Sequence, residues 1–128
     1  MKRISAVFGL TASLALATAA HAAELAGSEW GFPGEDLAFV QFGAEGRVSG
    51  KAYCNSFTGG YEAGADGSFL AGPLAVTRMA CEGDLMEKER DFLDRLQTAK
   101  SYARDGIRLQ LHDAEGGTLL DLTQRDAD

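Results

Sequence analysis

Small groups of glycine divide this sequence into short apolar runs, and this spacing restricts the folds that the chain can adopt. Fifteen of the 16 glycines lie after residue 22, in groups such as "GAEGR", "GG" and "GADG". Glycine permits the positive φ of tight turns, and short apolar runs between turns are typical of β-strands. Asp66-Gly67 is a hairpin signal because both residues tolerate positive φ. The sequence therefore predicts a mostly β domain with many chain reversals.

The apolar runs alternate as strands require. In residues 37–42, Ala38, Val40 and Phe42 share one face, while Leu37 and Phe39 lie on the other. This pattern predicts a central strand that is apolar on both faces.

Pro73 interrupts a later run, "SFLAGPLAV". Proline donates no ladder hydrogen bond, so this strand is expected to end, bend or lie at a sheet edge there.

One segment, residues 84–98, has helical periodicity. Phe92 and Leu96 fall near one face, and charged side chains fill most of the remainder. Asp84 is a candidate N-cap, and Glu87 is spaced to reach back to the backbone N–H of the cap residue. A single helix between strands, without βαβ repetition, favours an antiparallel α+β fold or a partly closed barrel over a parallel sheet.

The first 22 residues have the three parts of a secretory signal peptide. Lys2 and Arg3 form a basic start, an uncharged apolar stretch follows, and Ala20-His21-Ala22 has the small-x-small form of a cleavage site. We therefore expect cleavage after Ala22, a single domain over residues 23–128, and a periplasmic or secreted protein. No cysteine lies near the cut, so neither a lipid anchor nor stable membrane insertion is expected after cleavage.

Charge argues against two classes of partner. The whole chain has a net charge of −7, and the predicted mature chain has −9 because the signal holds two cations and no acid. Such a chain repels phosphate backbones and anionic lipid surfaces, so nucleic-acid binding and peripheral membrane docking are not expected. A cationic partner remains compatible with this charge.

Cys54 and Cys81 are the two cysteines of the chain, and such residues can serve as a nucleophile, as metal ligands or as a disulfide. A nucleophilic cysteine needs a base, and His112 is the single histidine after residue 22. The two cysteines and this histidine also lack the closely spaced pairs of a zinc site. An even number of cysteines in an exported chain favours a disulfide between Cys54 and Cys81, with a Cys54–His112 pair as the minor alternative.

Other catalytic and metal motifs are absent from the sequence. It contains no phosphate-binding glycine loop before a helix, no G-x-S-x-G elbow and no calcium loop. The acidic residues around the helix start are interpreted as a solvated face rather than a cation site: Glu82, Asp84, Glu87, Glu89 and Asp91. We therefore expect no enzymatic activity, no metal and no cofactor.

Five segments together resemble the META domain, also called the HslJ-like heat-shock protein family: "GSEW", "GRVSGKAYCNSFTGGYE", "LAVTRMAC", "EKERDFLDRL" and "LQLHDAEGGTLLDL". The resemblance implies a small, mostly β domain with one helix packed on a curved sheet. It also implies an exported or envelope-anchored bacterial protein, linked in some members to heat or antibiotic stress. The family has no established catalytic residues to transfer to this chain.

Within this frame, the motif residues divide into a core and a candidate recognition patch. Aromatic residues bury the largest areas, which makes the following the expected core and its rim: Trp30, Phe39, Phe57, Tyr61, Phe69 and Phe92. Polar residues beside the two cysteines form the candidate recognition patch: Asn55, Ser56, Thr58, Thr77 and Arg78.

The sequence leaves three function classes. The first is a stress-associated binding or structural module, expected as a monomer, that contacts an envelope protein. The second is an inhibitor of a cationic hydrolase such as a protease or lysozyme, to which the acidic chain is steered electrostatically. The third is a carrier of a small ligand. A large apolar pocket is expected for the carrier, and a protruding loop with exposed apolar anchors for the inhibitor.

Overall fold

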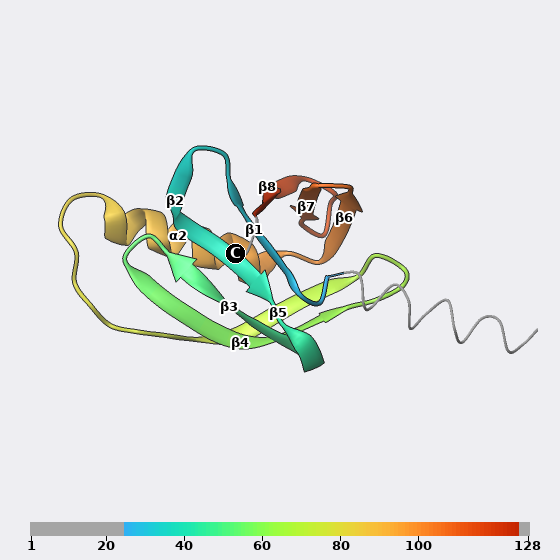
Figure 1. Ribbon diagram of the computed structural model, residues 1–128, viewed down its shortest axis with the longest axis horizontal. Helices are drawn as coiled ribbons and strands as arrows, with labels where there is room; N and C mark the ends of the chain where they lie inside the picture. Colours follow the sequence, from blue (N-terminus) through green and yellow to red (C-terminus); the bar gives the residue numbers. More distant parts are fainter. Residues whose placement is uncertain (1–24, 126–128) are drawn as a thin grey trace, which may run out of the picture.

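Residues 25–125 fold into one curved antiparallel sheet of eight strands with one α-helix packed on it (Figure 1). This structure is a computed structural model, and it describes residues 25–125. The elements are β1 (Ser28–Phe32), β2 (Glu35–Phe42), the 3-10 turn η1 (Ala44–Gly46), β3 (Arg47–Ala52), β4 (Asn55–Ala63), β5 (Phe69–Val76), α2 (Leu85–Thr98), β6 (Ser101–Asp105), β7 (Arg108–His112) and β8 (Thr118–Arg125). The predicted signal peptide lies outside the described residues.

The strand order is β5-β4-β3-β2-β1-β8-β7-β6, so β5 and β6 are the two edges of the sheet. The sheet is not closed into a barrel. The edges meet only at one corner, where Ser68 forms a bridge with Ser101 and Phe69 donates its N–H to the carbonyl of Lys100. Helix α2 joins the two edge strands and packs on β3, β5 and β8. The predicted α+β fold with one helix is confirmed, and Pro73 lies on an edge strand as expected.

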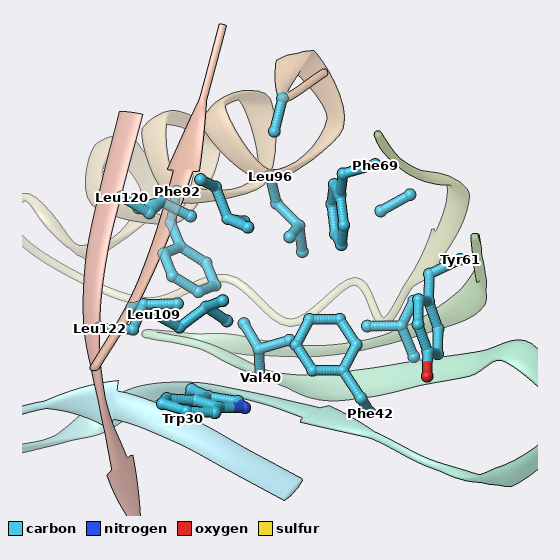
Figure 2. Close-up of a cluster of buried hydrophobic side chains, with 14 of the residues drawn as sticks. Trp30, Val40, Phe42, Tyr61, Phe69, Phe92, Leu96, Leu109, Leu120 and Leu122 are labelled. Atoms are coloured by element: carbon cyan, nitrogen blue, oxygen red, sulfur yellow. The ribbon is translucent and has the colours of Figure 1, made fainter. Parts of the chain in front are cut away.

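The core fills the space between the concave side of the sheet and α2. Figure 2 shows Phe92 and Leu96 extending from the helix towards Val40 and Phe42 of β2. Five of the six aromatic residues predicted for the core are buried: Trp30, Phe57, Tyr61, Phe69 and Phe92.

Strand β2 is central, as predicted, but only one of its faces is buried. Ala38, Val40 and Phe42 are fully buried, whereas Leu37 on the other face is 44% exposed. Phe39, the sixth predicted aromatic residue, is half-buried on this outer face, with the Arg125 guanidinium 4.5 Å from the centre of its ring. Within residues 25–125, no second layer covers this face, because helix α2 lies on the concave side.

The helix spans Leu85–Thr98 with Asp84 as its N-cap residue, in agreement with the predicted residues 84–98. The predicted capping box is wrong, because no side chain caps the helix start. Asp84 has φ −93° and ψ 10°, outside the extended conformation from which a cap side chain reaches the free N–H groups. Its carboxylate instead lies 3.7 Å from the Lys88 ammonium.

Candidate functional site: a groove between β5 and α2

A groove of about 790 Å³ runs between edge strand β5 and helix α2. One wall is formed by the end of β5 and the segment that follows it, residues 74–79, and the other by the facing side of α2. Thirteen residues line it: Asn55, Leu74, Ala75, Val76, Thr77, Arg78, Met79, Met86, Glu89, Arg90, Leu93, Asp94 and Gln97. We call this feature the β5–α2 groove.

A buried polar network forms one end of the groove. Asn55, 1% exposed, donates its backbone N–H to Glu89 Oε1 at 2.8 Å and its Nδ2 to Glu89 Oε2 at 3.2 Å. Its side-chain oxygen accepts the Thr77 hydroxyl at 2.8 Å and the Met79 N–H at 2.7 Å. Because buried polar groups are costly when unpaired, these bonds fix the helix, β4 and the chain after β5 against one another.

A disulfide holds the segment between β5 and α2 nearer to the helix. Cys54, immediately before Asn55, is bonded to Cys81, and their Cα atoms are 6.0 Å apart. Figure 1 shows the segment between β5 and α2, drawn in yellow, looping out at one end of the sheet. The disulfide and the Asn55 network therefore act on a connection that would otherwise be a free loop, and they hold one wall of the groove in place.

The structure divides the predicted recognition patch between two surfaces. Asn55, Thr77 and Arg78 line the groove. Ser56 and Thr58 are exposed and alternate along β4 with the buried Asn55 and Phe57, so they lie on the outer face of the sheet. Ser56 contributes backbone groups: its N–H is donated to the Thr77 hydroxyl at 3.1 Å, and its carbonyl accepts the Thr77 N–H at 3.0 Å.

Glu89 is the groove residue that sequence reasoning missed. It was grouped with the solvated carboxylates of the helix, but it is 8% exposed and accepts both hydrogen bonds from Asn55. Helical periodicity predicts that Glu89 is buried, since it is four residues after Leu85 and three before Phe92, on the side of the helix that faces the core. The interpretation of the whole acidic cluster as a solvated face is therefore wrong at this position.

Two exposed cations lie in the groove without partners. Within residues 25–125, neither Arg78 nor Arg90 forms a hydrogen bond or an ion pair. Arg95 on the same helix, by contrast, binds Asp91 at 2.9 Å. Asp94 lines the groove as well, one helical turn beyond Arg90.

The structure places the candidate nucleophile, the candidate base and the potential metal ligands. The sulfur of Cys54 is held in the disulfide and supplies no thiolate. His112, the alternative base, lies at the end of β7 with its Nε2 3.3 Å from the side-chain oxygen of Gln110. Within residues 25–125, no three His, Cys, Asp or Glu side chains are placed to hold a metal ion.

A smaller hollow of about 330 Å³ lies on the opposite flank of α2, beside Tyr53 and Phe92. Burial, together with a hydrogen bond to Glu35, raises the pKa of Tyr53 to about 12. The Lys88 ammonium lies 5.8 Å from the centre of the Tyr53 ring. This hollow is less than half the size of the β5–α2 groove, and its floor belongs to the hydrophobic core.

The family model of the META domain matches residues 15–126. The chain belongs to the META domain family. The match includes both cysteines and every residue of the β5–α2 groove. No curated protein matches the chain significantly.

Solved structures share the fold of this META domain. A protein from Burkholderia xenovorans, determined by NMR, is 22% identical with a TM-score of 0.62, over 96% of this chain and 95% of the other. A second NMR structure is 23% identical with a TM-score of 0.58, over 82% and 93%. A DUF4847 family protein from Bacteroides vulgatus is 19% identical with a TM-score of 0.57, over 73% and 62%. At these identities the likeness concerns the fold alone.

Proposed function

We propose that this META domain protein is an exported, non-catalytic binding module of the bacterial cell envelope, and that the β5–α2 groove receives its partner. One observation carries the proposal: the groove is built in advance by a disulfide and a buried hydrogen-bond network, yet it presents two arginines that are unpaired within residues 25–125. A preformed site loses little conformational freedom on binding, which favours affinity.

Several features support the remaining parts of the proposal. The signal-like residues 1–22 and the disulfide both fit an oxidising compartment outside the cytoplasm. No catalytic activity is indicated by the META domain match or by the structural neighbours. The association with envelope stress rests on the resemblance to stress-linked members of the family.

Site-specific photo-crosslinking in the native cell tests this function. Gln97, an exposed groove residue, is replaced by the photo-reactive amino acid benzoylphenylalanine, and the matched control carries it at Thr58 on the outer face of β4. We expect the periplasmic fraction to contain the chain with Ala23 as its first residue. We also expect one protein to be crosslinked from position 97 and not from position 58. A chain retained in the cytoplasm, or equal crosslinks from both positions, would contradict the proposal.

One observation favours a second candidate, the inhibitor of a cationic hydrolase. Met79 is 58% exposed on the segment that the disulfide and Asn55 hold in place, which resembles an apolar anchor on a rigid loop. Inhibition of lysozyme or of a cationic protease by the wild-type protein, lost in Met79→Asp, would favour this candidate. The carrier has less support, because aromatic and aliphatic side chains fill the concave side of the sheet (Figure 2).

A further inference from the structure

We propose that the β5–α2 groove binds an extended peptide segment of a partner protein as an additional strand on β5, and that Arg78 and Arg90 bind an acidic side chain of this peptide. This inference rests on the proposed function, since it names the chemical class of the partner received by the groove. Three features carry it: a strand edge with unpaired backbone groups, an apolar wall, and the two free cations.

One hydrogen bond shows which residues at the end of β5 turn their backbone N–H and C=O groups towards β4 and which turn them away. Thr77 donates its N–H to the carbonyl of Ser56 at 3.0 Å, so Thr77 points its backbone groups towards β4. In an antiparallel ladder these groups alternate, which turns the N–H and C=O of Val76 and Leu74 to the opposite side. That side faces the groove, where both residues are part of the lining. Because β5 is the first strand in the sheet order, no strand within residues 25–125 pairs with it there.

The same edge already accepts a backbone partner at its other end. Phe69, the first residue of β5, donates its N–H to Lys100 at 2.9 Å, and Ser68 bridges Ser101. The chain therefore uses this edge for strand pairing where β6 begins, and leaves it unpaired along the groove. Pro73 has no N–H, so an added strand is expected to pair mainly with Leu74 and Val76.

The side chains of the groove fit the alternating pattern of an extended peptide. Leu74 and Val76 are half-buried against the core, and Met86 and Leu93 face them from α2. Alternate residues of an added strand point to one face, so every second peptide side chain would lie against this apolar surface. Strand addition beside a helix is an established recognition mode, in which backbone bonds give affinity and side-chain pockets give specificity.

Charge determines which peptides are favoured. A guanidinium binds a carboxylate through two parallel hydrogen bonds, and in the described part of the chain no group occupies these donors of Arg78 or Arg90. Asp94 and Gln97 line the other end of the groove, where the Gln97 side chain approaches Gly72. We therefore expect an acidic residue in the part of the peptide beside Arg78 and Arg90, and no acidic residue beside Asp94.

Selection from a library of displayed random seven-residue peptides tests the inference on the purified exported protein. Three baits are compared: wild type, the double variant Arg78→Glu with Arg90→Glu, and the control Thr58→Glu. Wild type and control are expected to select peptides with alternating apolar residues and one acidic residue. The double variant is expected to select a basic residue at that position.

Peptides made from the selected sequence then test strand pairing directly. N-methylation removes one amide donor at a time. In one register of alternate amides, methyl groups on the amides that pair with Leu74 and Val76 are each expected to weaken binding at least about tenfold, equivalent to ~1.4 kcal/mol. In the other register, where the amides face away from β5, affinity is expected to stay within about twofold.

Each remaining outcome overturns the inference. No enrichment over an unrelated acidic protein, the same peptides from all three baits, or equal effects of methylation in both registers would each exclude strand addition at this groove. A concentration-dependent dimer that masks the groove would assign the edge to a second copy of the chain instead. If crosslinking from position 97 still identifies a partner, the proposed function survives and only the peptide inference fails. If both experiments fail, the groove is not a binding site.

Discussion

Replacement of Glu89 by alanine tests the buried network that supports the groove. The Glu89 carboxylate accepts the Asn55 backbone N–H at 2.8 Å and Nδ2 at 3.2 Å, and neither residue is exposed by more than 8%. Truncation removes both bonds and leaves a buried amide donor unpaired. The helix itself is not weakened by the change, because alanine has the highest helix propensity.

The expected cost follows from these two bonds. A hydrogen bond to a charged group contributes about 1.5–3 kcal/mol, and an unpaired buried donor costs about 1–3 kcal/mol. The second bond is the weaker, since Asn55 Nδ2 keeps the carbonyl of Met79 at 3.2 Å and the groove admits water. We therefore expect Glu89→Ala to lower the free energy of unfolding by about 2.5 kcal/mol. Glu89→Gln keeps one acceptor and is expected to lose about 1 kcal/mol.

Urea unfolding followed by circular dichroism measures these differences, with Glu87→Ala as the matched control. Glu87 is an exposed carboxylate on the same helix, so its loss is expected to change stability by less than about 0.5 kcal/mol. Subtracting the control removes the gain in helix propensity, which both variants share. If Glu89→Ala unfolds within about 0.5 kcal/mol of Glu87→Ala, the network does not hold the helix to β4.

Three further predictions concern other parts of the fold. Cys54→Ser opens the loop between cysteines 27 residues apart, which costs about 3.5 kcal/mol of stability in the chain-entropy model. Calorimetry is expected to show a melting point lower by roughly 15 °C, while the far-UV spectrum at low temperature stays β-rich. An unchanged melting point would exclude the disulfide. The pKa of Tyr53 is raised from 10.0 to about 12, so the stability from its neutral phenol is present below pH 10.0 and lost as the pH rises through 12. Ultraviolet titration, with the other two tyrosines replaced by phenylalanine, is expected to show a lower pKa of Tyr53 in Glu35→Gln. An unchanged pKa would refute the hydrogen bond between Tyr53 and Glu35. Gly59→Ala places a Cβ 2.6 Å from the Pro73 carbonyl oxygen, so urea unfolding is expected to show a loss of about 1–3 kcal/mol, and a neutral effect would mean that β4 and β5 separate freely.

The strands and the helix could be predicted from the sequence because their signals are local. Alternation over residues 37–42 placed Ala38, Val40 and Phe42 on the buried face, and the helical period located α2 to within one residue. Whether the other face of β2 would be covered could not be predicted in this way. That depends on how many layers form, and Leu37 is exposed because α2, the helix within residues 25–125, covers only the concave side.

The candidate site could be predicted only in part. Asn55, Thr77 and Arg78 lie together in the groove, where a disulfide brings neighbours of the two cysteines close to one another. Ser56 and Thr58 lie on the opposite face of β4 from Asn55, as period-two alternation predicts. The predicted recognition patch included them because they are close to Cys54 in sequence. The partner of Asn55 lies 34 residues away on the helix, and no local pattern reveals such a tertiary pair.

Hydrogen exchange at the outward edge of β5 tests the central claim most directly. The amides of Leu74 and Val76 face the groove without a strand partner within residues 25–125, so both are expected to exchange rapidly in the free protein. Once the crosslinked partner or the selected peptide is bound, both amides are expected to become protected, while the paired amide of Thr77 changes little. Binding that leaves Leu74 and Val76 in fast exchange, with protection gained elsewhere, would contradict the assignment of the β5–α2 groove as the binding site.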